Sequence, residues 1–469
     1  MWNIVLIASL LIVLLMLIFI SYGVHFLAQE KEVVDSAKEG YHEGKISVSQ
    51  TFIYTGIVLV IVAILVSTYF AIKGTPWEGH LMEWMNIVVR VMHITFGIAW
   101  IGASFYFVFL ENALNRTKDV REELAGNLWA VHGGGFYYLE KYKIAPKKIP
   151  KDLHWFKYEA YFTWISGFSL LFIVYYFNAH AFLIDKTILD IGPLAAILIG
   201  IGSFIVAWVM YDMLCKTPLI KKGPWFALVG FIILMGWAYF YTHVFSARAA
   251  YMHFGAMIGT LMVGNVFFII IPSQKAMVHA AKQNKPLNPA LRKHAGLRSL
   301  HNNYFTLPVL FVMVSNHFPS TFGYTYSWIV LLIISLGAAG IKHYLNLKER
   351  GQLSVWVMPI SVLILLSAVF ITLPPKNTAK CSANITINEV YAIVQKRCTS
   401  CHSRKPTDDA LTAPPNGVVY ETPADILRLK DKILQRVVIT KTMPQNNKTG
   451  MTEEERNRIR CWIEQEAQG

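Results

Sequence analysis

The chain has 469 residues, of which 54% are hydrophobic and only 15% are charged. This composition excludes an ordinary soluble domain and is typical of a polytopic membrane protein. The formal net charge is +14, and in a membrane protein such an excess usually marks loops kept on the cytoplasmic side. No basic stretch is interleaved with aromatic residues, so we expect no nucleic-acid partner.

The first apolar run, about residues 4–20, lacks a basic leader and a small-residue cleavage site, so it predicts a retained helix rather than a removed signal peptide. Further runs are long enough, or nearly so, to cross a hydrocarbon core of ~30 Å. They fall near residues 51–72, 83–111, 159–179, 192–214, 225–245, 249–272, 302–316, 327–344 and 354–373, and the run at 302–316 is short and broken by Pro308. The sequence therefore predicts an all-α, polytopic transmembrane bundle of about ten helices.

Loop charges set the expected orientation of these helices. Basic residues gather in the segments 116–151, 216–222, 275–298 and 342–350, where Lys342, Lys348 and Arg350 lie, whereas the segments 180–191, 245–249 and 317–326 hold almost none. By the positive-inside rule the basic segments are cytoplasmic. The alternation places everything after Leu373 on the outer side, where disulfides are expected.

One predicted helix carries a polar stripe. Charged side chains within a membrane span are costly and usually face an interior site. Arg90, His93, Gly97, Trp100 and Ser104 recur at steps of three and four, so they share one face. We expect that face to look into the bundle. The alternative is that Arg90 snorkels to the interface and His93 is a hydrogen-bonded core histidine.

A second histidine, His253, shares a helix face with Thr260 and Gly264. With His93 it is the first pair to test as the two axial ligands of a haem b between helices. Loose histidines in a bundle are more often hydrogen-bonded core residues, and the spacing of these two is not diagnostic. A haem b therefore stays one of two alternatives.

The run at 302–316 has polar residues at both ends. It begins with His301, Asn302, Asn303 and Tyr304 and ends with Ser315, Asn316 and His317. Broken helices place polar groups where a cavity can be lined, and Arg298, one turn earlier, offers charge to an anion. Ordinary interfacial capping explains the same residues.

Three glycines follow His132 in the segment before the run at 159–179. Glycines let backbone approach a ligand closely, but no strand is expected before them and no phosphate signature follows. We interpret the segment as a flexible turn, with His132 a weak site candidate.

Near the C-terminus, Cys398-Thr399-Ser400-Cys401-His402 is the c-type haem attachment signature. Cys398 and Cys401 would form thioethers to one covalent haem c, and His402 would bind its iron. Zinc would need two further ligands at short spacing, which are not present. Met443, beside Pro444, is the expected second axial ligand, and the alternative for Met443 is a core filler.

The haem-attachment sequence lies in a segment with its own helix signals. Thr386 with Glu389 and Thr452 with Glu455 match capping boxes that open a first and a last helix. A small class I cytochrome c packs two such helices together. Cys381, just before the first of these helices, and Cys461, within the last, could then form a disulfide, the alternative being two unrelated thiols.

Several stretches, taken in order, resemble one family. They are residues 83–86, 89–93, 97–106, 128–137, 301–304 and 315–317, and they lead into the haem-attachment sequence. Together they are similar to the bacterial integral-membrane urate oxidases (urate hydroxylases) fused to cytochrome c. The resemblance covers roughly Glu83 to the C-terminus.

The resemblance implies an oxidoreductase that converts urate to 5-hydroxyisourate and passes electrons through its cytochrome c to the respiratory chain, without forming peroxide. It implies eight core helices, which match the third to tenth predicted here. The expected domains are 1–78, two extra helices; 79–373, the membrane domain; 374–380, a linker; and 381–469, a periplasmic cytochrome c. We expect a multi-pass protein of the bacterial inner membrane, with lipid, urate and a soluble cytochrome c or terminal oxidase as partners.

Urate is an electron-rich anionic purine, so its site needs a cationic donor, amide-like groups and an aromatic face. Two sets of residues offer these groups: Arg298, Asn302, Asn303 and Tyr304, or Arg90, His93 and Trp100. His301 or His93 is the expected base. A site near His301 would leave electrons most of a ~30 Å core to cross, so either the site lies in the outer half near His93 or an internal relay such as haem b exists.

Two other functions fit the same layout. A respiratory electron-transfer subunit would use the helices to dock the cytochrome c and would pass electrons from quinol. A transporter would use the haem domain as a redox sensor. Reduction of the haem by urate without oxygen separates both from the oxidase.

Overall fold

The computed structural model of the chain describes residues 75–466, except 118, 147, 151–152, 353, 374–380, 382–383, 409–410 and 412. The chain divides into two units, Met1–Trp84 and Met85–Gly469. Of the first unit, the structure describes only residues 75–84, where helix α3 (Pro76–Ala113) begins. The predicted helices near 4–20 and 51–72 lie outside the described residues.

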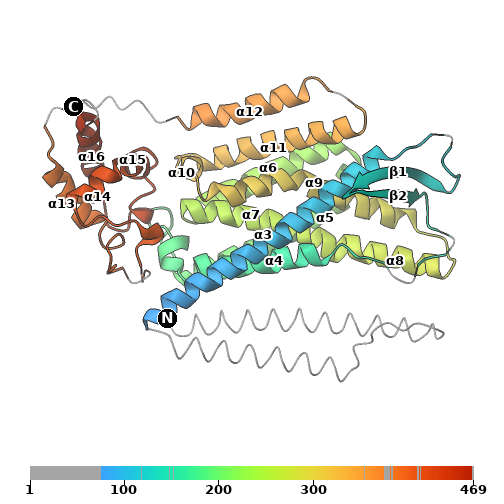
Figure 1. Ribbon diagram of the computed structural model, residues 1–469, viewed down its shortest axis with the longest axis horizontal. Coiled ribbons are helices and arrows are strands. Elements are labelled where there is room, and N and C mark those ends of the chain that lie inside the picture. Colours follow the sequence, from blue (N-terminus) through green and yellow to red (C-terminus); the bar gives the residue numbers. More distant parts are fainter. Residues whose placement is uncertain are drawn as a thin grey trace. The chain divides into compact units, whose positions relative to one another are not determined.

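Helices make up most of the second unit (Figure 1). Up to residue 373 they are α3, α4 (Tyr158–Leu171), α5 (Pro193–Lys216), α6 (Gly223–Thr242), α7 (Ala247–Gly264), α8 (Ile271–Lys282), α9 (Pro289–Ser315), α10 (Pro319–Phe322), α11 (Ser327–Glu349) and α12 (Val357–Ile371), with short helical turns η1 (Phe172–Tyr176), η2 (Ala179–Leu183), η3 (Pro218–Lys221) and η4 (Asn265–Ile270). Each of the eight apolar runs predicted between residues 83 and 373 is mainly helical, so the all-α class is confirmed.

Five helices in the described part of the chain are long and apolar enough to cross a membrane. They are Trp77–Ala113, Pro193–Lys216, Gly223–Thr242, Ala247–Lys282 and Ser327–Glu349, and the apolar helix Val357–Ile371 is shorter. Their outward faces are apolar: Ile98 on α3 is 68% exposed and Ile205 on α5 is 63% exposed. Such surfaces are suited to lipid tails and would be poorly solvated in water.

Two helices depart from the predicted regular pattern. α7 passes through the π-helical turn η4 into α8, and the wider turn brings Asn265 to a fully buried position. α9 runs unbroken from Pro289 to Ser315 with Pro308 inside it, so the prediction of a short, proline-broken span is wrong. Contacts of α9 with α7, η4 and α11 support the helix where the proline removes a backbone hydrogen bond.

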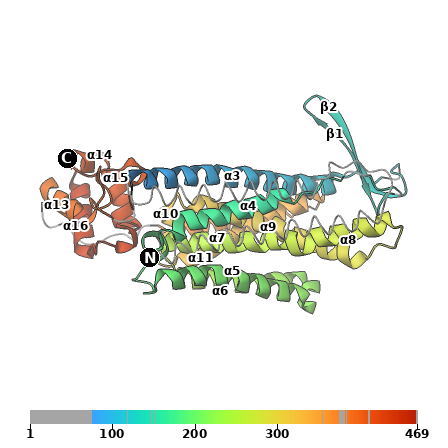
Figure 2. The ribbon, with the colours of Figure 1, turned by 90° about the horizontal axis from the view of Figure 1, so that it is seen from below.

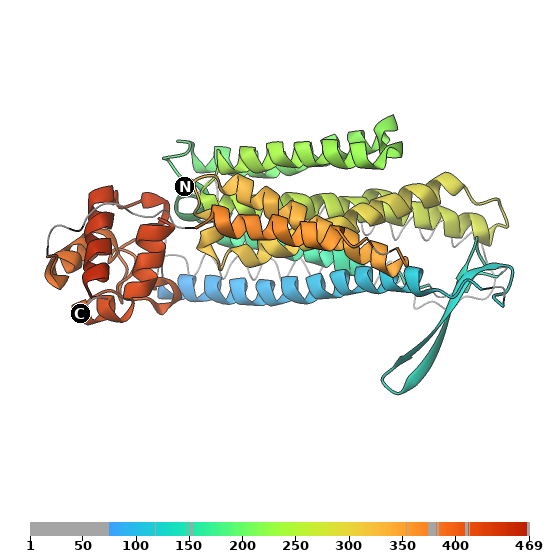
Figure 3. The same cartoon turned by 90° about the horizontal axis from the view of Figure 1, so that it is seen from above.

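α11 is longer than its apolar run indicates. It extends to Glu349 and packs along α12, as Figure 3 also shows. Lys342 therefore lies inside the helix, and it is only 3% exposed. The prediction that Lys342 is a cytoplasmic loop charge is therefore wrong, because its side chain faces the protein interior.

A β-hairpin stands where the sequence analysis expects a flexible turn. Strands β1 (Leu124–His132) and β2 (Gly135–Tyr142) pair antiparallel, with His132 opposite Gly135 (Figure 2). Gly133 and Gly134 form the two-residue connection with φ of 58° and 78°, the left-handed conformation that such tight turns require. The expectation that no strand precedes the glycines is thus wrong. His132 is exposed at the end of β1.

The C-terminal region, residues 381–466, is a small helical assembly. Its elements are α13 (Ile387–Arg397), η5 (Pro415–Gly417), α14 (Pro423–Arg428), α15 (Lys430–Ile433), η6 (Leu434–Ile439), η7 (Gln445–Asn447) and α16 (Glu453–Glu466). The expected packing of its first helix on its last is present: Val390 and Val394 of α13 share a buried core with Ile459 and Trp462 of α16.

Local capping and ion pairing explain where these helices begin. Both capping boxes predicted from the sequence are formed, Thr386 with Glu389 and Thr452 with Glu455. The Glu455 carboxylate also accepts two hydrogen bonds of 3.0 Å from Arg397, which ties α16 to the end of α13.

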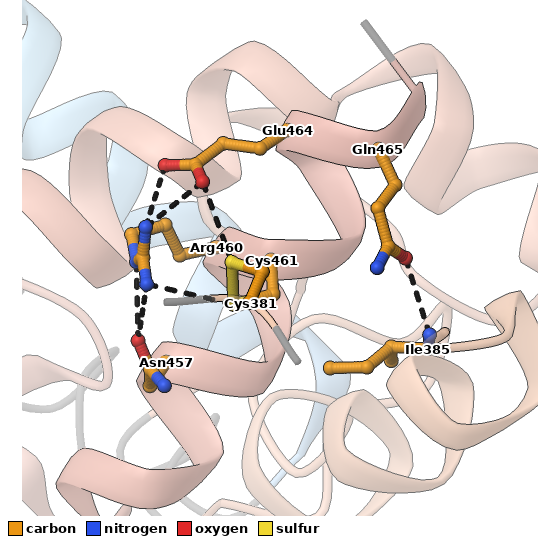
Figure 4. Close-up of a disulfide and its surroundings, with 7 residues drawn as sticks. All are labelled: Cys381, Ile385, Asn457, Arg460, Cys461, Glu464 and Gln465. Atoms are coloured by element: carbon orange, nitrogen blue, oxygen red, sulfur yellow. Dashed lines mark hydrogen bonds and ion pairs between the residues drawn. A yellow bond between two sulfur atoms is a disulfide. The ribbon is translucent and has the colours of Figure 1, made fainter. Parts of the chain in front are cut away.

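A disulfide joins Cys381 to Cys461 across 80 residues of sequence (Figure 4). The sequence left this pairing and two unrelated thiols as alternatives. Beside the disulfide, Arg460 donates to the Glu464 carboxylate at 2.8 Å, and Gln465 accepts from the Ile385 amide at 3.1 Å. The disulfide therefore links the residues before α13 to the middle of α16.

Candidate functional site

Residues from α5, η4 and α9 meet in a buried polar network, which we call the α5–α9 network: Tyr211, Asp212, Asn265, Arg298, His301 and Asn302. Arg298 donates to the Asp212 carboxylate at 2.5 Å and to the Asn265 side-chain oxygen at 3.2 Å. The Asn265 amide nitrogen donates to Asn302 at 2.8 Å and to the Tyr211 hydroxyl at 2.9 Å. The sequence candidates Arg298 and Asn302 are thus brought together.

His301 attaches to this network from one side. Its Nδ1 lies 2.7 Å from the Tyr211 hydroxyl, and its ring stacks on Phe226 at a centroid distance of 5.0 Å. The sequence analysis missed Tyr211, Asp212 and Asn265. These residues come from other helices, and single polar residues in apolar runs gave no signal of a shared partner.

The charge of Arg298 is already compensated within the network. Asp212 pairs with Arg298 and also lies 2.6 Å from Lys216. The Asp212 side chain is 16% exposed and that of Arg298 only 7%, so the pair is held where water screens it poorly. Arg298 therefore holds Asn265 and Asp212 in place, and its role in binding substrate stays a prediction.

Asn303 faces a different neighbour, Asn346 of α11. The Asn346 amide nitrogen donates to the Asn303 side-chain oxygen at 3.0 Å. Asn346 is 4% exposed and Asn303 is 2% exposed. The other amide atoms, Asn303 Nδ2 and Asn346 Oδ1, have no partner among the described residues. Tyr304 instead bonds His343, with its hydroxyl 2.6 Å from Nδ1.

The polar stripe of α3 is only partly buried. Gly97 is buried, His93 and Trp100 are half-buried, and Arg90 is exposed and donates to Asn86 at 2.9 Å. His93 Nδ1 lies 2.9 Å from the Thr163 carbonyl, and a Cβ on Gly167 would approach the imidazole to 2.8 Å. Since a carbonyl can only accept, Nδ1 carries the proton and Nε2 is left as a proton acceptor. The Thr163 carbonyl and the closeness of Gly167 thus fix the orientation of the His93 ring.

The structure gives no support for a haem b ligated by His93 and His253. His253 is fully buried, with Nδ1 2.8 Å from the Ala249 carbonyl and Nε2 3.0 Å from the Tyr176 hydroxyl. Gly200 lies so close that an added Cβ would be 3.0 Å from Nε2. Both ring nitrogens are engaged among the described residues, which is the arrangement of a hydrogen-bonded core histidine, the alternative that the sequence left open; a haem b stays a prediction.

At the start of α7, Arg248 forms a second polar group with Asn316 and Tyr175, which we call the Arg248 cluster. Arg248 donates to the Asn316 side-chain oxygen at 3.0 Å, and the Tyr175 hydroxyl donates to the same oxygen at 3.5 Å. Arg248 also interacts electrostatically with Arg90 of α3 and with Arg436 of the C-terminal region. No carboxylate forms a salt bridge with Arg248 among the residues described.

The C-terminal region contacts the helical bundle near this cluster. Gln445 and Asn446 of η7 donate to the Ala181 carbonyl of η2 at 3.0 and 3.2 Å, and Asn446 also donates to the Ile184 carbonyl at 2.8 Å. Burial lowers the pKa of Arg436, and the positive charge of Arg248 lowers it further. The two guanidinium groups are therefore close enough to repel each other.

The residues of the haem-attachment sequence fit a haem c. His402 follows Cys401 after α13, and its Nδ1 lies 3.0 Å from the Val418 carbonyl. Nδ1 must donate to that carbonyl, so Nε2 presents its lone pair for iron; burial lowers the pKa of His402, which favours the neutral ligand form. Met443 and Cys398 both pack against the core of the C-terminal region. These donors are those that c-type ligation uses.

These features define a class: an α-helical bundle with membrane-length apolar helices and buried polar groups, followed by a small helical region that contains the sequence Cys398-Thr399-Ser400-Cys401-His402. A family model described as Urate oxidase N-terminal matches residues 79–373. The chain therefore belongs to this family, and the family supports a role in urate-related oxidation. Searches of curated proteins and of solved structures give no match. The matched residues comprise the bundle and leave out the C-terminal region.

Proposed function

We propose that the chain oxidises urate to 5-hydroxyisourate in its helical bundle and passes the electrons to a haem c bound by its C-terminal region. The observation that carries the proposal is the order of parts in one chain. The urate oxidase match ends at residue 373, and Cys398, Cys401 and His402 follow in a region that docks on the same bundle. The region proposed to oxidise urate and the region proposed to bind the haem are thus parts of one chain.

The reaction balances without oxygen. Urate and one water give 5-hydroxyisourate, two protons and two electrons, as the water oxygen bonds to C5 of the purine. The bound haem supplies a one-electron acceptor, so each urate requires two successive reductions of the haem. Because no oxygen is consumed, no peroxide forms.

We assign the substrate to the Arg248 cluster, extended by Arg90. Two guanidinium groups that form no salt bridge with a carboxylate among the described residues suit an anion, and the start of α7 adds the positive end of a helix dipole. Asn316 and Tyr175 contribute an amide and an aromatic hydroxyl. Arg298, the other predicted cation, has its charge compensated by Asp212 and lacks this capacity.

The choice of this position is supported by the electron path that it offers. Arg248 interacts electrostatically with Arg436 of the C-terminal region, and Met443 precedes by two residues the Gln445 side chain that bonds η2. A purine at Arg248 would therefore lie on the side of the bundle that contacts the proposed haem-binding region. In this proposal no haem b relay within the bundle is needed.

His93 is the base we assign. Its Nδ1 proton is fixed by the Thr163 carbonyl, which leaves Nε2 to accept a proton from urate or from the attacking water. His93 also interacts electrostatically with Arg90, which belongs to the substrate position. His301 is held by Tyr211 in the α5–α9 network and is a positioning residue in this proposal.

The location that fits this function is the bacterial inner membrane, with the C-terminal region in the periplasm. Five described helices are suited to a membrane, and the loop charges favour an outer C-terminus. A periplasmic haem c could deliver electrons to a soluble cytochrome c or a terminal oxidase.

The test uses full-length protein under anaerobic conditions. Urate should produce the absorption bands of reduced haem c, with two haems reduced per urate consumed, and pyridine haemochrome spectra should show haem c alone. If the haem stays ferric with urate but is reduced by quinol, the chain is a respiratory electron-transfer subunit and the proposal fails. Solute transport without any change in haem redox state would favour the redox-sensing transporter.

A further inference from the structure

The amide pair Asn303–Asn346 lies between α9 and α11 and leaves one donor and one acceptor unused. The two residues share a single hydrogen bond of 3.0 Å. Asn303 Nδ2 and Asn346 Oδ1 are buried and have no partner in the described part of the chain. Buried polar atoms are almost always hydrogen-bonded, so unpaired ones call for a ligand or an explanation.

A buried cation lies one helical turn from this pair. Lys342 and Asn346 are four residues apart on α11 and therefore share a face; Lys342 is 3% exposed. Its ammonium lies 3.9 Å from the centroid of the Phe105 ring. No salt bridge to Lys342 occurs among the described residues, and Glu349, seven residues further along α11, interacts with it only electrostatically; an ionisable group inside a membrane span normally has a close partner or a function.

We propose that Asn303, Asn346 and Lys342 form a binding position for an anionic cyclic urea, the chemical class of urate, separate from the Arg248 cluster. A cyclic urea presents a carbonyl oxygen beside an N–H group. The oxygen can accept from Asn303 Nδ2, and the N–H can donate to Asn346 Oδ1. The negative charge of the ring is balanced by Lys342, and Phe105 supplies an aromatic contact. The choice of urate as the ligand rests on the proposed function.

A purely structural account of the unpaired atoms and the ligand account make different predictions. If the pair were purely structural, replacing it with apolar residues of similar shape would weaken the packing of α9 on α11. If the pair were a ligand position, the same change would remove a desolvation cost and leave the empty protein as stable or more stable. Ligand binding and ligand-free stability should then change in opposite directions.

The test is equilibrium dialysis of labelled urate against full-length protein whose haem is kept reduced with dithionite, so that no turnover occurs. The double variant Asn303→Leu with Asn346→Leu is compared with the wild type. Asn112→Leu is the matched control, because Asn112 of α3 also bonds α11, donating to Glu349 at 2.9 Å, but leaves no buried amide atom unpaired.

We expect the double variant to lose one bound urate per chain, or to bind it at least about tenfold more weakly, while the control keeps it. Lys342→Met should weaken binding of urate but leave a neutral cyclic urea unaffected. The ligand-free melting temperature of the double variant should equal or exceed that of the wild type. Unchanged urate binding in the double variant, or a lower ligand-free melting temperature, overturns the proposal.

The outcome is separable from that of the proposed function. Binding is measured on reduced protein and does not depend on haem reduction. If urate binds at the Asn303–Asn346 position but never reduces the haem, the proposed function fails and this position stands. If urate reduces the haem and the double variant binds urate as the wild type does, only this position fails.

Discussion

Replacement of Arg248 by Gln is the sharpest test of where the substrate binds. A hydrogen bond to a charged group contributes about 1.5–3 kcal/mol, which corresponds to a rise in KM for urate of about 10- to 150-fold. Arg90 and Arg436, which interact electrostatically with Arg248, are both positive. The substitution therefore removes repulsion rather than an ion pair, and we expect a loss of stability no larger than that of the one hydrogen bond to Asn316, about 1 kcal/mol.

The assay is the rate of haem reduction in anaerobic stopped flow as a function of urate concentration. Arg248→Lys should restore part of the affinity, because Lys keeps the charge but not the planar, two-pronged geometry. Arg292→Gln is the matched control; Arg292 donates to the Lys143 carbonyl at 2.5 Å and lies outside the cluster. Reduction by dithionite should be the same in all variants. A KM for Arg248→Gln within about twofold of the wild type would refute the assignment.

Three further predictions concern stability. Asp212→Asn leaves the buried charge of Arg298 uncompensated and should lower the free energy of unfolding by about 3–5 kcal/mol in thermal or denaturant melts; a loss under about 1 kcal/mol would show that the pair is well hydrated. Cys461→Ala opens the disulfide with Cys381, which closes 80 residues, and should destabilise the C-terminal region by about 4 kcal/mol, measured by protease resistance; equal resistance in the oxidised wild type and the variant would contradict this. Burial raises the pKa of Glu455, but its hydrogen bonds and arginine partner lower it more, so the net pKa lies below 4.5. That stabilisation is therefore present above pH 4.5 and lost as the pH falls through the folded-state pKa, and the acid-unfolding curve of Glu455→Gln should be flatter than that of the wild type.

The helices were predictable because their signal is local. A run such as 192–214 is apolar throughout, and any arrangement must satisfy its backbone within the helix, so α5 appears where it was expected. The hairpin β1–β2 was not predictable in this way. Trp129, Val131 and Phe136 are 68%, 67% and 78% exposed, so the strands lack the alternation of buried and exposed residues by which strands are recognised.

The sites were harder to predict because they depend on partners from distant parts of the chain. Arg298 and Arg248 are equally basic in the sequence, yet Asp212, 86 residues away, compensates only the first. Lys342 was expected in a cytoplasmic loop and is buried, and Asn346, which the sequence did not single out, is buried and bonded to Asn303 of α9. Neither fact follows from spacing within one helix, since charge compensation and burial are properties of packing between helices.

The two proposed positions differ in what they can contribute to electron transfer. The Arg248 cluster lies near the start of α11, because Tyr251, one turn after Arg248, donates to the carbonyl of Ser327. Lys342 lies 15 residues after Ser327 on α11. At 1.5 Å per residue this separates Lys342 from the start of the helix by about 22 Å. Tunnelling rates fall steeply over such a distance, so a purine beside Lys342 is a poor electron donor to the C-terminal region. Lys342→Met should therefore weaken urate binding in dialysis but leave both the urate concentration needed for half-maximal haem reduction and the rate at saturation unchanged. If it lowers the saturated rate instead, oxidation takes place at Lys342, and the assignment of the reaction to Arg248 is wrong.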